Sequence, residues 1–496
     1  MGVFQNNLMG AAAAAASGSG TTIYDYQIAN SVRLNGSDQY FNRTASSGST
    51  NSDKKAISVW YKRAGTTGNT GATYIMSCQQ DRLAALFVND GDTADNFGYF
   101  TDNGGQNGKG KFLQRDFNAW YHLVFLYDAT LSTGVDRVKV YINGVHYTTA
   151  DTTFWNIDNN GYPGSGTQIG FGMQNNDNNI GRYQYNGSGY FNGYLADFIM
   201  IDGGTVPSIS DFGETVNGVW VPKDPSGLTF GTNGFWLKFE SGSDLGNDSS
   251  GNNNDWTANN FSAHDQMLDS PTFNSSSNGG NFATLGPLWK TPDMTFSEGN
   301  LKWTCSTNQR GAMSNWSIPL EGKYYFEYVP LSWGNSSGDD MWLGLNVSTV
   351  DFTASRGGKA TCYGYGANSG KKIDGDNTED SYGASWGTND IIGVAVDRVN
   401  DTIQFSKNGS FQGSAFAIPA TADLFPWVGS GGGSSSASGV FNFGQDGTFA
   451  GAKTAQGNSD DTGYGNFYYD PPTGFLALCS GNLPVAAAVD PAQTDD

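Results

Sequence analysis

One pattern occurs twice in this chain: an alternating run that ends in Asp, a second alternating run, and then Asn-Gly. In the later copy the two runs cover residues 394–397 and 402–406, and Asn408 precedes Gly409. Strict alternation of apolar and polar residues is typical of a strand with one buried face. Asn-Gly tolerates the positive φ angles that short hairpin turns require. The pattern therefore predicts two paired strands followed by a tight turn.

The earlier copy has the same parts with a longer loop between the strands. Its two runs end at Asp128 and just before Asn143, which correspond to Asp397 and Asn408 in the later copy. The Asp-to-Asn spacing is 15 residues in the earlier copy and 11 in the later one. Two sheet domains built on similar plans are the simplest explanation of the repeat.

The rest of the chain favours strands over helices. It contains 69 Gly but only 15 Pro among 496 residues, and its many Asn, Ser and Asp indicate frequent turns. No long stretch shows a 3.6-residue periodicity with caps. Aromatic residues make up 14% of the chain, which is enough to build sizeable cores. We therefore predict an all-β protein of two antiparallel β-sandwich (jelly-roll) domains in tandem, preceded by an extended N-terminal segment.

Charge and cysteine content exclude several kinds of function. The net charge of −21 argues against a nucleic-acid surface and against binding to an anionic membrane. No run of 18 apolar residues is present, so we expect no membrane insertion. The four cysteines are far apart and form no metal-binding pair, which favours reduced thiols over a disulfide scaffold: Cys78, Cys305, Cys362 and Cys479.

The first residues allow two interpretations. No Lys or Arg precedes Arg33, so the positive region of a secretion signal is missing. The segment can be a disordered leader, or it can be a docking tail in which small residues lie against a partner and Phe4, Leu8 and Met9 fill pockets.

Strand-like runs divide the remaining sequence. They include "AISVWYKR", with Ile57, Val59 and Tyr61 on one face, and "AWYHLVFLYD", which is apolar on both faces and so predicts a central strand. The predicted division is an N-terminal docking or leader segment, a first sandwich, a connector, a second sandwich and a C-terminal extension, at residues 1–22, 23–264, 265–295, 296–446 and 447–496.

Each sandwich resembles a known family. The phrases "WYHLV", "VYING" and "GYLADF" resemble the laminin-G-like branch of the concanavalin-A-like jelly rolls, which implies two antiparallel sheets packed face to face. The phrases "YYFEY", "WLGL", "DIIGVAVD", "IQFSKNG", "LFPWV" and "FNFGQ" resemble a SPRY domain. That resemblance implies a bent β-sandwich whose loops at one end bind proteins or glycans.

The combination of segments resembles virion surface proteins of marine tailed bacteriophages. It implies a structural protein of a tail or head fibre or appendage, docked by its N-terminus to other virion proteins, with sandwich loops that contact host-surface glycans. Such a protein assembles in the host cytoplasm and self-associates, commonly as a trimer. The alternatives are a secreted glycan-binding module or glycoside hydrolase, and a pure assembly protein.

The acidic residues give no sign of catalysis. A retaining glycosidase needs two carboxylates about 5 Å apart, but none of the six Glu has another Glu within five residues. A Gly-x-Ser-x-Gly elbow between a strand and a helix is absent too. We therefore expect no enzyme activity.

One acidic loop is a candidate calcium site. Clustered oxygen ligands suit Ca²⁺, and the resemblance to laminin-G-like domains favours the loop that holds Asp244, Asp248 and Asp255. The alternative is that these residues only form polar turns.

Aromatic residues in the second sandwich are candidate binding residues. Tyr363, Tyr365, Tyr382 and Trp386 flank the polar stretch 366–381, an arrangement that suits a glycan or a protein ligand. The alternative is that two of them, the first Tyr and the Trp, pack the edge of the sandwich. A similar but weaker group is formed by Tyr183, Tyr185 and Tyr190.

Overall fold

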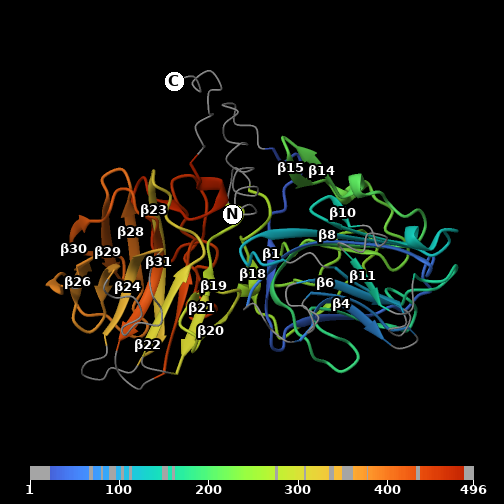
Figure 1. The fold of residues 1–496 in the computed structure, drawn as a ribbon, viewed down its shortest axis with the longest axis horizontal. Helices are drawn as coiled ribbons and strands as arrows, with labels where there is room; N and C mark the ends of the chain where they lie inside the picture. Colours follow the sequence, from blue (N-terminus) through green and yellow to red (C-terminus); the bar gives the residue numbers. More distant parts are fainter. Residues whose placement is uncertain are drawn as a thin grey trace.

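The computed structural model describes residues 23–484, except for 66–70, 80–81, 89–95, 102–105, 111–113, 148–154, 159–161, 274–277, 307–308, 334–339, 349–360, 377 and 432–435. Two β-sandwiches lie side by side (Figure 1). Within the described residues every regular element is a strand or a short 3₁₀ turn. The prediction of an all-β protein with tandem sandwiches is confirmed. The candidate docking residues Phe4, Leu8 and Met9 lie outside the described residues.

Two antiparallel sheets form the first sandwich. One has the order β10-β9-β8-β3-β13-β1-β18: Val145–Tyr147, Val138–Ile142, Trp120–Asp128, Lys54–Arg63, Asn192–Asp202, Ser31–Asn35 and Gln266–Met267, with β16 (Phe235–Leu237) also paired to β13. The other has the order β11-β7-β6-β5-β4-β12-β2-β17: Trp155–Asp158, Gln106–Gly110, Phe97–Thr101, Ala84–Val88, Thr73–Gln79, Asp177–Ile180, Tyr40–Thr44 and Thr257–Asn259. Ile57, Val59 and Tyr61 face the core between the sheets.

The second sandwich is also built from two sheets. One has the order β20-β21-β32-β23-β28-β29-β30: Met294–Ser297, Lys302–Cys305, Ala437–Asn442, Lys323–Ser332, Ile392–Asp397, Thr402–Lys407 and Ser410–Ala417. The other has the order β19-β22-β31-β24-β25-β26-β27: Leu285–Lys290, Gln309–Ser314, Leu424–Gly431, Asp340–Val347, Cys362–Gly366, Lys371–Asp374 and Asp380–Ser381. The predicted connector thus supplies β18 to the first sandwich and β19 to the second. The C-terminal extension supplies β33 (Leu476–Ala477), which pairs with β23.

Both copies of the repeated sequence pattern form the predicted hairpins, β8-β9-β10 and β28-β29-β30. Asn143 and Asn408 both have positive φ angles, 50° and 49°. Each Asn makes two hydrogen bonds to one earlier residue. His122 N donates to Asn143 Oδ1 at 2.7 Å, and Ile391 N donates to Asn408 Oδ1 at 2.9 Å. The Asn backbone amides donate to the carbonyls of the same two residues.

The equivalence extends to a third strand in each sandwich. Lys54 lies opposite Asp128 across β3 and β8, and their side chains are 3.8 Å apart. Lys323 lies opposite Asp397 across β23 and β28, at 2.9 Å. The sheet that contains β8 and the sheet that contains β28 can be aligned strand by strand. Six of the seven strands then occur in the same sequence order in both sheets: β1, β3, β8, β9, β10 and β13 match β21, β23, β28, β29, β30 and β32. The two sandwiches therefore share one sheet plan.

The outer face of the β3-β8-β13 sheet packs against the second sandwich through buried polar groups. Arg33 is fully buried and lies 2.8 Å from Asp446, 3.3 Å from Asp265 and 3.2 Å from Glu298. On the same face, Tyr194 Oη donates to the Gly299 carbonyl at 2.9 Å.

A second buried group at this junction centres on Asp269. Lys62 Nζ lies 2.7 Å from Asp269 and donates to Asn281 Oδ1 at 2.7 Å. Trp120 Nε1 also donates to Asp269, at 2.9 Å. These bonds and the Arg33 cluster hold the two sandwiches in a fixed relation.

Candidate functional site

The four predicted aromatic residues of the second sandwich come together, but mainly as part of its core. Tyr365 is fully buried and Trp386 is 3% exposed, with their rings 6.0 Å apart. Tyr382 is half-buried, and its Oη accepts a hydrogen bond from Phe405 N at 3.0 Å. Tyr363 is also half-buried and packs against the same core. Core packing covers Tyr365 and Trp386, in line with the alternative that the Trp packs the sandwich, whereas a binding role for Tyr363 and Tyr382 stays a prediction.

The candidate calcium loop is held together by its own hydrogen bonds. Asp248 accepts from the backbone amides of Trp236, Ser250 and Asn254, and from the Ser250 hydroxyl. Asp255 accepts from Asp248 N, and Asp244 is exposed. Among the described residues no group of three or more acidic, His or Cys side chains could hold a metal ion. The loop therefore gives the calcium prediction no geometric support.

Ser58 and His122 resemble a nucleophile and base but have the wrong proton arrangement. His122 Nε2 lies 2.8 Å from Ser58 Oγ, and Trp220 Nε1 donates to His122 Nδ1 at 2.9 Å. Burial lowers the pKa of His122 to about 3, so the ring is neutral. Because an indole N–H can only donate, Nδ1 must accept and the ring proton lies on Nε2. The imidazole donates to the hydroxyl and cannot take its proton.

Glu327 is a buried carboxylate at the contact between the second sandwich and the C-terminal extension. Its oxygens accept from the backbone amides of Tyr468 and Tyr469 at 2.9 and 2.8 Å, and from Asn442 Nδ2 at 3.1 Å. Burial raises the pKa of Glu327 to about 7, although these donors favour the charged form. The carboxylate fixes the extension to the sandwich.

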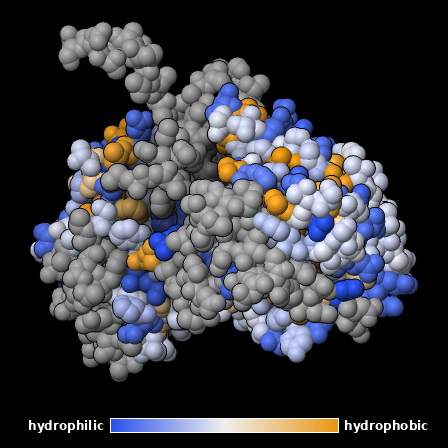
Figure 2. Space-filling view, turned by 45° about the vertical axis from the view of Figure 1, so that its right-hand side comes forward, coloured by the Kyte–Doolittle hydropathy of each residue, from blue (hydrophilic) through white to orange (hydrophobic). Residues whose placement is uncertain are grey.

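Exposed large hydrophobic side chains are scattered over the described surface: Leu131, Val145, Tyr185, Leu288, Trp289, Leu320, Val399 and Phe411. In the view of Figure 2 the hydrophobic groups likewise form small separate spots on a mainly hydrophilic surface. Leu288 and Trp289 are adjacent, 63% and 39% exposed, and the Trp289 ring stacks on half-buried Phe425 at 6.2 Å. We call Leu288, Trp289 and Phe425 the β19 surface.

The path of β19 explains why this surface is exposed. Between the pairs Leu285–Ser314 and Lys290–Ala312, β19 has several more residues than β22, so the strand bulges. A Cβ on Gly286 would lie 2.7 Å from the Trp289 ring, so glycine is needed for the ring to fold back here. Beneath the surface lies a buried cluster of Met313, Trp342, Cys362, Ile373 and Trp427.

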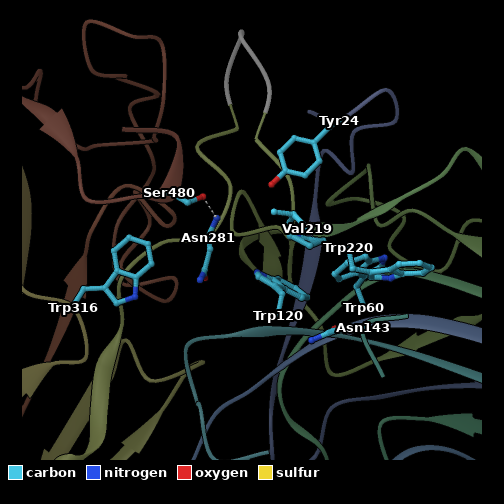
Figure 3. Close-up of a pocket in the computed structure, with 10 residues that line it drawn as sticks. Tyr24, Trp60, Trp120, Asn143, Val219, Trp220, Asn281, Trp316 and Ser480 are labelled. Carbon is cyan, nitrogen blue, oxygen red and sulfur yellow. Dashed lines mark hydrogen bonds between the residues drawn. The ribbon is translucent and has the colours of Figure 1, made fainter. Parts of the chain in front are cut away.

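A pocket opens where the two sandwiches meet (Figure 3). Trp60, Trp120 and Trp220 lie on the side of the first sandwich, and Trp316 lies on the side of the second. The other lining residues are Tyr24, Asn143, Val219, Pro271, Asn281 and Ser480. Trp60 stacks on His122 with ring centroids 4.4 Å apart, which holds one wall rigid.

Sequence reasoning missed both the β19 surface and this pocket. Trp289 lies in "GPLWK", inside the predicted connector, and Trp220 lies in "GVWVP". An apolar residue beside Gly-Pro was the available signal in the first case. The pocket gave none, because its walls come from segments hundreds of residues apart.

Part of the second sandwich matches a known domain family. Residues 323–446 match the family model of the SPRY domain, so a SPRY domain is present. Ran-binding protein 9 of Xenopus tropicalis is 30% identical over 178 residues, which cover 33% of this chain and 31% of that protein. Human Ran-binding protein 9 is 34% identical over 109 residues, 22% of this chain and 14% of that protein.

The chain thus spans less than a third of the length of the first curated relatives it matches. Among solved structures, the SPRY domain of human HERC1 is 20% identical and covers 32% of this chain and 96% of that chain, with a TM-score of 0.27.

These relatives overturn the prediction of a phage virion protein. They are Ran-binding proteins of animals, including Homo sapiens and Drosophila melanogaster, and not components of phage particles. The predicted display on a tail or head fibre and the predicted virion location are therefore wrong. The described residues contain no helix long and apolar enough to cross a membrane.

Proposed function

We propose that this chain is a non-catalytic binding protein whose second sandwich, which contains the SPRY match, holds a protein partner on the β19 surface. The observation that carries the proposal is the exposed pair Leu288 and Trp289 beside Phe425. Two findings support it. The domain family matches at 323–446, and the matched relatives are named for binding another protein.

The shape and chemistry of the β19 surface favour a protein over other ligands. Small molecules bind in concave sites, whereas Leu288 and Trp289 project from a bulged edge strand. Trp is enriched among the residues that dominate protein interfaces. A well-packed buried layer under the surface keeps its rings in place, which lowers the entropy lost on binding.

Selection from a random peptide library on the full chain tests this proposal. We expect selected peptides to lose at least about tenfold in affinity with Trp289→Ala and with Leu288→Ser, because about 1.4 kcal/mol of lost contact is tenfold. Val399→Ala is the matched control, because Val399 is 67% exposed but lies in the β28-β29 turn. Circular dichroism melting shows whether each variant is folded. Peptides that bind all four proteins equally would overturn the proposal.

Two further assignments stay proposals. Two packed antiparallel sheets support a laminin-G-like class for the first sandwich. The second proposal is that the chain self-associates as a trimer. The molar mass of the full chain in multi-angle light scattering tests it.

A further inference from the structure

The pocket between the sandwiches is separate from the β19 surface and needs its own explanation. Its ten lining residues carry no charged side chain, although the chain has a net charge of −21. Four of the five aromatic rings are at least nine-tenths buried, and Trp220 is half-buried. The pocket therefore suits an uncharged ligand group.

The size of the pocket narrows the ligand to a single small group. Its volume is about 80 Å³, whereas an engineered cavity of ~150 Å³ admits benzene. A nucleotide or a sugar chain is too large to enter. One compact aliphatic side chain fits.

The unused polar atoms of the pocket are donors. Asn143 Nδ2 and Trp316 Nε1 donate to no described residue, while Asn143 Oδ1 is already occupied by His122 N. Asn281 N donates to Ser480 Oγ at 3.1 Å, and the Ser480 hydroxyl donates to the Gly279 carbonyl at 3.3 Å, so both groups already have partners. A ligand that brings carbonyl acceptors and no donor leaves no polar group unpaired.

We propose that this pocket binds a proline residue within a polyproline II segment of a protein partner. Proline has a compact ring and no N–H. A polyproline II segment has no internal hydrogen bonds, so its carbonyls are free to accept from Asn143 and Trp316. Aromatic-lined sites recognise such segments at low entropic cost, because the segment is already ordered. The site is independent of the β19 surface.

Fluorescence anisotropy with a fluorescein-labelled decaproline peptide and the full chain tests the proposal. Val219→Trp fills the pocket from its half-buried rim and should weaken binding by at least about tenfold. Trp316→Phe keeps an aromatic wall and removes the Nε1 donor, so it should weaken binding severalfold. Trp289→Ala, on the β19 surface, should leave the affinity unchanged, which separates this proposal from the one above. Melting curves confirm that each variant is folded.

Four results would overturn the proposal. One is the absence of saturable binding by decaproline. The second is equal binding of a Gly-Ser peptide of the same length, and the third is equal affinity in Val219→Trp. The fourth is binding that occurs only after residues 1–20 are removed, which would assign the pocket to the N-terminal segment of the chain itself.

Discussion

Two opposing effects act on the pKa of Glu327: burial raises it and hydrogen bonds lower it. The three donors described above and the Tyr325 hydroxyl, at 3.3 Å, favour a carboxylate, but complete burial raises its pKa to about 7. Between the ordinary value of 4.5 and about 7, the folded chain binds more protons than the unfolded chain at this residue. Its contribution to the free energy of unfolding is therefore fully present below the lower value and decreases as the pH rises through this window.

We predict that Glu327 lowers the free energy of unfolding by about 3 kcal/mol as the pH rises across that window. Glu327→Gln removes this dependence, because an amide does not titrate there. The comparison is urea unfolding of both proteins at about pH 5 and about pH 7.5, read as the difference between their pH slopes. Identical slopes would show that Glu327 titrates in its ordinary range.

At the scale of the element, the two hairpins depend on one Asn each. Asn408 adopts a left-handed conformation and also accepts the amide of Ile391. We predict that Asn408→Ala lowers the free energy of unfolding by about 1–3 kcal/mol. Alanine is strained in the left-handed conformation, and the Ile391 amide loses its hydrogen-bond acceptor. Hydrogen exchange at Ile391 and in β28 and β29 should accelerate. Asn143→Ala should do the same for β8 and β9 alone. Exchange that spreads equally to both sandwiches in either variant would contradict this local role.

The hairpins were predictable because all their signals are local. Alternation and Asn-Gly lie within about twenty residues, and hairpin pairing follows from them. The pairing of Lys54 with Asp128 was not predictable, because it needs the register between β3 and β8. The position of Trp386 was left open between a binding loop and the edge of the sandwich, because tertiary packing decides its exposure. The bulge that exposes Trp289 likewise arises only when β19 pairs with β22.

At the scale of the whole molecule, Arg33 couples the sandwiches. Its guanidinium is fully buried among Asp265, Glu298 and Asp446. Burial alone would raise the pKa of Asp446, but the nearby Arg33 cation holds that pKa below its usual range. Removing one partner from a buried ionic cluster lowers the free energy of unfolding by more than the cluster contributes to it, because the remaining charges stay buried without compensation.

We predict that Arg33→Met destabilises the chain by about 3–5 kcal/mol and divides one calorimetric unfolding peak into two. Lys54→Met is the matched control. It removes a cation from a partly exposed pair with Asp128, and such pairs contribute at most about 1 kcal/mol. A single peak in both variants, at similar temperatures, would mean that the interface is held by its apolar contacts.

The arrangement of partners around Arg33 also sets an order of events during synthesis. The first sandwich lacks its edge strand β18 until residue 267 has been made, and the ionic cluster lacks Asp446 until much later. At typical rates of ~5–20 residues per second, the ribosome needs roughly ten to forty seconds between these two points. During that interval the nascent first sandwich presents an arginine and a tryptophan-rich face to solvent or to a chaperone. The second sandwich, made last, covers that face and ends its exposure.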